Sequence, residues 1–386
     1  MNPASQPIKS KFLVPKSRQT LVHRPRLLSQ LQTGIQRSLT LVSAPPGFGK
    51  TTLLVEWAAG ELRPLAWFSL DSEDNDPVRF ASNLVSAFDS LQVAGVAPLT
   101  SPDRSLPPQL ILQTLLTELD DLTADAVLVL DDYHIIQSPQ VHELVAFLLE
   151  HLPARLHLVI ATRADPPIPL ARLRAQGELK ELRADDLRFT EEEAASFLQD
   201  MMGLSLTPKD VSALEAKTEG WISGLQLAAL SMQGRQDMES FVQTFSGSHR
   251  YILDYLVEEV LSHQPVHIQQ FLLQTSILEE LSAPLCSAVT GMDSDAQTTL
   301  EYLERANIFT IPLDDDRHWY RYHHLFADLL RVRLGQSSAE LVPALHQRAA
   351  VWLDQYGFTI PAVQHALAAK EFTLAAEIIQ AHSAER

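Results

Sequence analysis

The residues with the clearest chemical meaning form a Gly/Pro-rich stretch that ends in a lysine and two threonines, Ser43-Ala-Pro-Pro-Gly-Phe-Gly-Lys-Thr-Thr52. Its glycines let the backbone form a concave nest of amide N–H groups at the start of a helix, where the helix dipole also favours an anion. Lys50 then serves as a point charge for the β- and γ-phosphates, and the Thr51 hydroxyl serves as a magnesium ligand. We therefore expect a nucleotide phosphate to bind Ala44, Pro45, Pro46, Gly47, Phe48, Gly49, Lys50, Thr51 and Thr52.

The stretch departs from the strict G-x-x-x-x-G-K-[ST] pattern at one position, where Ala44 replaces the first glycine. Alanine is tolerated if the backbone there keeps a negative φ. An ordinary Gly/Pro-rich turn is the alternative interpretation. A dinucleotide-binding loop fits less well, because Gly47-x-Gly49 is followed by Lys-Thr and not by a third glycine.

The loop needs a strand before it and a helix after it. The apolar run 39–42 predicts a buried strand, and residues 51–59 have helical spacing. Further short apolar runs alternate with helical patterns, and Asp76 and Ser138 each precede a proline as candidate helix caps. This alternation predicts a parallel sheet covered on both faces, with strands at 39–42, 65–70, 126–130, 156–161 and 179–182.

After residue 187 the pattern becomes helical. Capping signals stand at Thr190 with Glu193 and at Thr207 before Pro208. Two short apolar runs, 308–313 and 319–322, flank a polar turn and suggest the hairpin of a winged helix. Helical patterns at 344–355, 362–369 and 374–380 resemble the start of a helical-repeat array. The fold class expected is α/β: a P-loop NTPase sheet, then a helical subdomain, a winged-helix module and the first repeats.

Composition limits the function classes. With 386 residues the chain is long enough for two or three domains, and its net charge of -18 argues against a broad basic face for nucleic acid. The single cysteine, Cys286, excludes an intrachain disulfide and a CxxC metal site. No apolar run is long enough to span a bilayer. These features predict a cytoplasmic protein with no membrane partner.

Two acidic residues and an arginine follow predicted strands at the edge where open α/β sheets bind ligands. The run 126–130 ends in Asp131 and Asp132; we expect Asp131 to hold magnesium through its water shell and Asp132 to position or deprotonate the attacking water. The run 158–161 leads to Arg163, which can reach a γ-phosphate. The alternatives are a solvated acid pair that caps the next helix, and a surface arginine paired with Asp165 or Asp132.

Taken in order, the motifs resemble the STAND class of signal-transduction ATPases and, within it, the MalT-like, LuxR-type regulators. The resemblance spans nearly the whole chain. The segments that carry it, besides the phosphate loop, are Leu21-Val-His-Arg-Pro-Arg-Leu-Leu28, Trp67-Phe-Ser-Leu-Asp71, Asn75-Asp-Pro-Val-Arg-Phe80, Leu130-Asp-Asp-Tyr-His134, Thr162-Arg-Ala-Asp-Pro-Pro167, Gly220-Trp-Ile-Ser-Gly-Leu-Gln-Leu227 and Trp319-Tyr-Arg-Tyr-His-His-Leu-Phe-Ala-Asp328.

The resemblance implies roles for further residues. In this class the segment before the first strand packs on adenine, which points to Val22 and Arg24, chiefly through the backbone. A Gly-Leu-Pro-Leu-like motif is represented by Gly224-Leu-Gln-Leu227, with Gln226 where relatives have proline. The Met-His-Asp motif of relatives corresponds to Tyr322-His-His324, so that His323 becomes the candidate contact to the β-phosphate of ADP, although His324 replaces the aspartate.

The same resemblance implies domains and a cycle. The expected domains are 1–36 (part of the adenine site), 37–187 (nucleotide binding), 188–262 (helical), 263–338 (winged helix) and 339–386 (TPR-like repeats). ADP would hold a closed monomer, ATP would allow self-association, and slow ATP hydrolysis would reset the switch. A small-molecule inducer would act through a downstream repeat domain and DNA would bind a C-terminal helix-turn-helix, neither visible in this chain, which we expect to be a fragment or a truncated form.

Other classes of P-loop protein remain possible at this stage. A small-molecule kinase would need an arginine-bearing lid, and a remodelling motor would need an arginine finger; Arg172 and Arg174 could serve in either. A scaffold whose nucleotide never turns over is a third possibility. The module order after residue 187 favours the switch.

Overall fold

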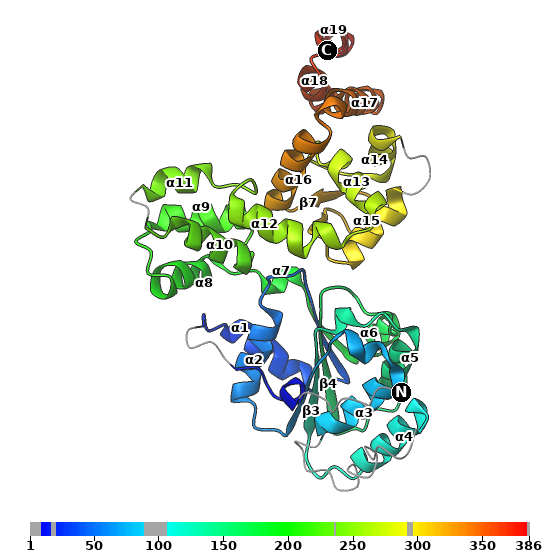
Figure 1. Ribbon diagram of the computed structural model, residues 1–386. Coiled ribbons are helices and arrows are strands. Elements are labelled where there is room, and N and C mark those ends of the chain that lie inside the picture. The colour runs from blue at the N-terminus through cyan, green and yellow to red at the C-terminus, as the bar shows by residue number, and fades with distance from the viewer. Residues whose placement is uncertain (1–8, 17–20, 89–105, 235–236, 292–295, 384–386) are drawn as a thin grey trace. The chain divides into compact units, whose positions relative to one another are not determined.

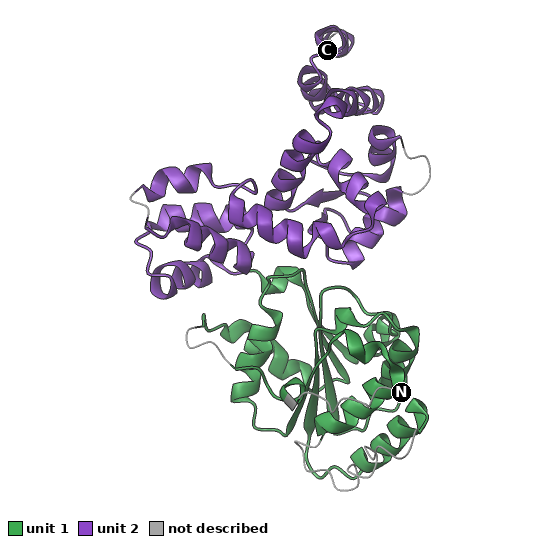
Figure 2. Ribbon diagram, viewed as in Figure 1, with its two compact units in different colours: residues 1–188 green, residues 189–386 purple. Residues whose placement is uncertain are grey.

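The chain divides into two compact units, Met1–Arg188 and Phe189–Arg386, which are coloured separately in Figure 2. The structure is a computed structural model, and it describes residues 9–16, 21–88, 106–234, 237–291 and 296–383. Each unit has its own apolar core. The two units are therefore described one at a time.

The first unit is built on a five-stranded parallel sheet with strand order β2-β3-β4-β1-β5. Four of the strands are almost wholly apolar and buried, as expected for a parallel sheet that helices cover on both faces. The predicted α/β fold class is confirmed in this unit. The strands are β1 (Leu39–Ser43), β2 (Leu65–Ser69), β3 (Ala126–Asp131), β4 (Leu156–Thr162) and β5 (Leu179–Leu182).

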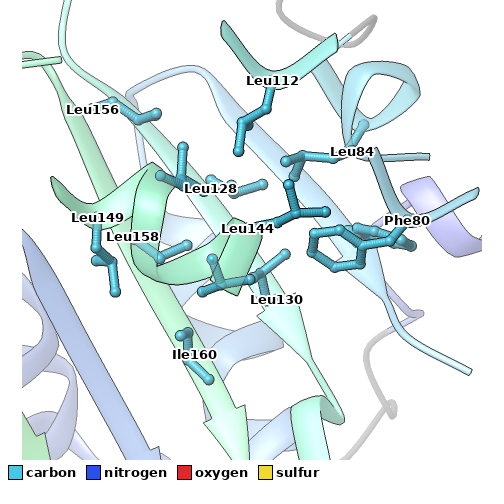
Figure 3. Packing of buried hydrophobic residues seen from close by; sticks show 14 of the residues in the cluster. Phe80, Leu84, Leu112, Leu128, Leu130, Leu144, Leu149, Leu156, Leu158 and Ile160 are labelled. Atoms are coloured by element: carbon cyan, nitrogen blue, oxygen red, sulfur yellow. The ribbon is translucent and has the colours of Figure 1, made fainter. Parts of the chain in front are cut away.

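Helices cover both faces of this sheet (Figure 1). On one face Leu128, Leu130, Leu158 and Ile160 point into a core that is completed by Leu144 and other apolar helix residues, as Figure 3 shows. The helices of this unit are α1 (Pro25–Gly34), α2 (Lys50–Gly60), α3 (Pro77–Ala87), α4 (Pro108–Leu119), α5 (Pro139–Glu150), α6 (Leu170–Gln176) and α7 (Ala184–Leu187).

One of the two predicted proline-associated caps is confirmed, and the other is wrong. The Asp76 side chain accepts a hydrogen bond from the Arg79 N–H at 2.8 Å at the start of α3. Helix α5 does begin at Pro139, but the Ser138 side chain makes no cap. Instead, the side chain of Asn75 accepts from the backbone N–H groups of Gln137 at 2.6 Å and Ser138 at 3.0 Å. The Asn75 side chain thus holds the two residues just before α5 and does not replace the missing cap.

The second unit is mostly helical and contains one two-stranded antiparallel hairpin. The predicted capping box of Thr190 with Glu193 is present, and Thr207, predicted to start a helix before Pro208, forms a second capping box with Asp210. The elements are α8 (Glu191–Ala195), a π-helical turn (Ser196–Met201), α9 (Pro208–Thr218), α10 (Ile222–Met232), α11 (Met238–Thr244), α12 (Arg250–Glu259), α13 (Val266–Thr275), α14 (Ala283–Thr290), α15 (Ala296–Arg305), β6 (Thr310–Pro312), β7 (Tyr320–Tyr322), α16 (His324–Ser337), α17 (Val342–Gln355), α18 (Thr359–Ala368) and α19 (Phe372–Ser383).

The helices of both units are short. Across the described ranges, none is both long enough and apolar enough to cross a membrane.

The sheet core provides a test of the first unit's stability. Leu158 is fully buried in β4, so Leu158→Ala should lower the free energy of unfolding by about 3 kcal/mol, because it removes buried methyl groups and leaves a cavity. Leu62→Ala is the control, since Leu62 is 98% exposed and its loss should change stability by less than about 0.5 kcal/mol. Urea denaturation followed by circular dichroism measures both. Equal midpoints for the two variants would contradict the packing described.

Candidate functional site

The Gly/Pro-rich loop leads from β1 into α2, as its pattern predicts. Gly47 and Gly49 have φ values of 81° and 73°, which side chains disfavour, and Gly49 directly precedes the first residue of α2. Ala44 is not among the residues with positive φ. The condition under which alanine can replace the first glycine is therefore met, and the loop has the backbone geometry of an anion-binding nest.

Lys50 lies inside this loop. Its Nζ donates hydrogen bonds to the carbonyl oxygens of Ala44 at 2.7 Å and Pro45 at 2.9 Å. Burial and the nearby charge of Arg163 lower the pKa of Lys50 to about 7, although Asp132 and Asp131 oppose the shift. The loop thus positions an ammonium group whose charged form needs additional negative charge close by.

The end of β3 contributes the acidic side of the site. The Thr51 hydroxyl donates to the Asp131 carboxylate at 3.1 Å, which joins the start of α2 to β3. Burial and the neighbouring Asp132 raise the pKa of Asp131 to about 6, against the effects of Thr51, the Asp132 N–H and Lys50. Asp132 itself has a positive φ of 58° and a side chain that is 47% exposed. Asp131 therefore faces the loop, while Asp132 also faces solvent.

Arg163 follows the last residue of β4 and lies close enough to Lys50 to lower its pKa. Asp165, a possible partner by sequence, is bound elsewhere: it accepts from Ser43 at 3.1 Å and from Arg183 at 3.0 Å. Because β3, β4 and β1 are neighbours in a parallel sheet, their carboxyl ends bring Asp131, Arg163 and the loop to one edge.

His134 belongs to the same cluster and was not predicted as a site residue. Its side chain is 18% exposed, and its Nδ1 lies 3.9 Å from an Asp132 carboxylate oxygen. Burial and the charges of Arg163 and Lys50 lower the pKa of His134 to about 3, so the imidazole is neutral at physiological pH. The only sequence signal was its place in Leu130-Asp-Asp-Tyr-His134.

These residues fit a magnesium nucleotide. A phosphate chain beside Lys50 would supply the negative charge that its buried ammonium lacks, and a divalent cation would favour the ionised form of Asp131. A hydroxyl and a carboxylate, here Thr51 and Asp131, are oxygen donors of the kind magnesium prefers. When bound, the ion would neutralise phosphate charge.

Val22 and Arg24 lie just before α1. Val22 is partly buried, whereas Arg24 is buried and its guanidinium donates to the carbonyls of Leu187 and Arg188, both at 2.8 Å. The Arg24 side chain therefore fixes the segment before α1 to the end of α7. Any contact of this segment with adenine would therefore be made by its backbone and by Val22.

His323, in the second unit, is buried just before α16. Its Nε2 donates to the Thr218 carbonyl at 2.9 Å, and its ring packs edge-on against Trp221 and Phe309. Gly224 of the Gly-Leu-Gln-Leu motif lies against the same indole, since a Cβ there would come within 2.6 Å of the Trp221 ring. These contacts join the ends of α9 and α10 to the hairpin.

Glu219 completes this cluster, and no sequence motif predicted it as a site residue. It lies at the end of α9 with φ 49°, and Arg321 of β7 donates to both of its carboxylate oxygens at 2.9 and 2.8 Å. Burial alone would raise the pKa of Glu219. The bonds from Arg321, the charge of His323 and the His324 N–H outweigh burial and lower that pKa to about 2.

A comparison with known proteins identifies the relatives of this chain. A family model described as the MalT winged helix domain matches residues 257–342. The HTH-type transcriptional regulator MalT of Serratia proteamaculans is 36% identical over 384 residues, which cover 97% of this chain and 42% of that protein. This chain is homologous to the MalT regulators. MalT of Klebsiella pneumoniae (strain ATCC 700721 / MGH 78578) is 35% identical over 382 residues, with the same coverage of both chains.

The chain spans about two fifths of the length of these MalT regulators, 42% in each case. Among solved structures, a Walker-type ATPase of Pyrococcus abyssi has a TM-score of 0.54 at 14% identity and covers 82% of this chain and 97% of its own. That likeness concerns the fold. The chain therefore combines a P-loop NTPase fold with a MalT-type winged helix, as its motifs predict.

The Glu219–Arg321 pair makes a pH-dependent prediction for the MalT-type winged helix. The folded state holds Glu219 ionised. The stabilisation of the fold by this carboxylate should therefore be complete above about pH 4.5 and should be lost as the pH falls towards 2. Glu219→Gln should then lower the free energy of unfolding by about 2 to 3 kcal/mol at pH 7, and by progressively less at acid pH. Urea denaturation across this pH range measures the difference. The exposed Glu239→Gln serves as control, and a pH-independent loss in Glu219→Gln would contradict the ion-pair account.

Proposed function

We propose that this chain is the nucleotide-controlled regulatory part of a MalT-like, LuxR-type transcriptional activator. The observation that carries the proposal is the loop around Lys50 facing the Thr51–Asp131 pair across the ends of β1 and β3. Homology to MalT over 97% of the chain supports the regulatory context. A loop of this kind without that homology would leave the class of ATPase open.

In this proposal ATP or ADP binds the residues of the phosphate loop, and Mg²⁺ is held by Thr51 and, through water, by Asp131. Asp132 positions the attacking water, and Arg163 responds to the γ-phosphate. The closeness of Arg163 to Lys50 supports that last role, because both charges would face the same phosphate group. Val22 and the backbone at Arg24 contribute to the adenine site.

The proposed cycle is a switch. ADP, contacted by His323, holds a resting monomer; ATP exchange and an inducer give a self-associating state; slow hydrolysis returns the protein to rest. The inducer acts through a downstream repeat domain, and DNA binds a C-terminal helix-turn-helix. The five domains predicted from sequence, with the bounds given above, belong to the same proposal.

The first test compares two substitutions within the loop and the acidic strand. Lys50→Ala should abolish nucleotide binding, because it removes the ammonium held at the centre of the nest. Asp131→Ala should leave much of the binding intact and reduce magnesium-dependent phosphate release by roughly a hundredfold or more. Isothermal titration with ATP and a phosphate-release assay measure the two effects.

Lys209→Ala, at an exposed position in the second unit, is the matched control for loss of a lysine. Equal ATP affinity in wild type and Lys50→Ala would refute the phosphate-loop assignment. Phosphate release that persists in Lys50→Ala would show that the hydrolysis does not occur at this loop. The alternative of a scaffold that does not hydrolyse its nucleotide would then be favoured.

A second test concerns His323. Its replacement by alanine should accelerate ADP release by roughly tenfold, the effect of losing one hydrogen bond to a charged group, and should raise basal self-association. His323→Gln can still donate to the Thr218 carbonyl. This variant therefore distinguishes loss of the contact to ADP from loss of the local contacts of His323. ADP exchange and mass photometry provide the readouts, with the exposed His267→Ala as control. Wild-type ADP retention and mass in a folded His323→Ala variant would exclude the latch.

No observation favours a kinase or a motor. The two arginines that either class could have used are paired on the surface, Arg172 with Glu150 and Arg174 with both carboxylate oxygens of Glu181. The switch is therefore the function that these residues support best.

A further inference from the structure

The second unit contains a cavity of about 390 Å³ that none of the sequence motifs identified. Its walls come from the segment between α13 and α14, the hairpin, and helices α17 and α18, whose order along the chain can be followed in Figure 1. This volume falls within the range of small-molecule sites. The side chains that give it chemical character are Glu279, Glu280, Trp319, His346, Phe358 and His365.

Aromatic rings form one side of the cavity. Trp319 meets Phe358 edge-on, with ring centroids 5.6 Å apart, and Trp352 stacks with Phe358 at 6.2 Å. Phe358 nevertheless remains 39% exposed. A large, partly exposed ring that two tryptophans hold in place offers a rigid surface to an apolar or cationic group.

Two imidazoles form another part of the wall. The Nδ1 atoms of His346 and His365 lie 2.8 Å apart, so one ring donates and the other accepts. Burial lowers the pKa of both rings, that of His365 to about 4 with a further contribution from His346. The nearby charge of Arg331 also lowers the pKa of His346, and both rings are therefore neutral at neutral pH. With one proton in the shared bond, the Nε2 of the donating ring must be an acceptor and the Nε2 of the other ring must be a donor.

Neither Nε2 has a hydrogen-bond partner within the part of the chain that the structure describes. Both rings line the cavity. The pair therefore has one free acceptor and one free donor for a molecule placed there.

The charged side chains in the described lining are both carboxylates, and one cation outside the lining, Arg331, lies close enough to His346 to lower its pKa. Glu279 and Glu280 are exposed at the cavity, and its described lining includes neither lysine nor arginine. An anion would be repelled by these two carboxylates, whereas a cation would be attracted by them and by the aromatic faces. An N–H group on that cation could also donate to the accepting imidazole.

We propose that this cavity binds a small organic cation, an ammonium group carried on an aromatic or apolar body. The ammonium lies at Glu279 and Glu280, and the body packs on Trp319 and Phe358. This site is separate from the phosphate loop and from the inducer site proposed in the downstream repeats.

The position of the cavity gives such a ligand a structural effect. Part of the wall lies within residues 257–342, the winged-helix match, and part lies in the helices that follow it. A molecule that contacts Trp319 on one side and His365 on the other joins these two parts. It would therefore stabilise one arrangement of α17 and α18 on the winged helix.

The test uses the full 386-residue chain and three probes with the same phenyl ring: phenethylamine, 2-phenylethanol and 3-phenylpropionate. Saturation-transfer NMR titrations give their relative affinities. Phenethylamine should bind at least about fivefold more tightly than the neutral alcohol, and the carboxylate should not bind measurably. Equal binding of amine and alcohol, or tighter binding of the carboxylate, would overturn the proposal.

Because the chain is strongly acidic, it could attract cations at many places. A control must therefore distinguish binding in the cavity from this general attraction. Glu279→Gln with Glu280→Gln should weaken phenethylamine binding about threefold to tenfold. Glu239→Gln with Glu258→Gln removes the same charge from exposed positions in the same unit and should leave binding unchanged. Similar losses in both double variants would show non-specific attraction and refute the site. Lys50→Ala should bind phenethylamine normally, since this site does not depend on the nucleotide.

Discussion

The burial of one ammonium group constrains much of the first unit. Lys50 can lie inside the loop only because the loop turns its own carbonyls, those of Ala44 and Pro45, toward Nζ. That turn requires positive φ at Gly47 and Gly49, and it sets where α2 begins. The start of α2 in turn places Thr51 against Asp131 at the end of β3. The buried charge of Lys50 thus determines the conformation of the loop, the start of α2 and the contact of Thr51 with Asp131 of β3.

The sequence predicted this part of the molecule well, for identifiable reasons. Buried parallel strands are continuous apolar runs, so β1, β3 and β4 stood out against their polar surroundings. The glycines, Lys50 and Thr51 occupy adjacent positions, so their chemistry could be inferred from a local pattern. Parallel strand order then explains why Asp131 and Arg163, far apart in sequence, end at the same edge.

What the sequence did not predict depends on contacts between distant positions. Asn75 accepts from the N–H of Ser138, 63 residues away, whereas the cap that the Ser138 side chain was expected to make is absent. Glu219 meets Arg321 across 102 positions, and no local pattern predicts that these two residues pair. Such pairs satisfy polar groups that become buried only when the chain is folded, and therefore they cannot be inferred from local periodicity.

The Glu219 cluster also shows how the second unit orders its histidine. A non-glycine residue with φ 49° is disfavoured by about 1 kcal/mol, and Glu219 keeps that conformation while its carboxylate accepts two bonds from Arg321 and one from the His324 N–H. The adjacent Thr218 carbonyl is then available to the Nε2 of His323. Glu219 lies close enough to His323 for the imidazole to help lower the pKa of its carboxyl group. The Glu219–Arg321 ion pair and His323 are for this reason one electrostatic unit, and the proposed His323 latch would depend on the charge of Glu219 as well as on the imidazole.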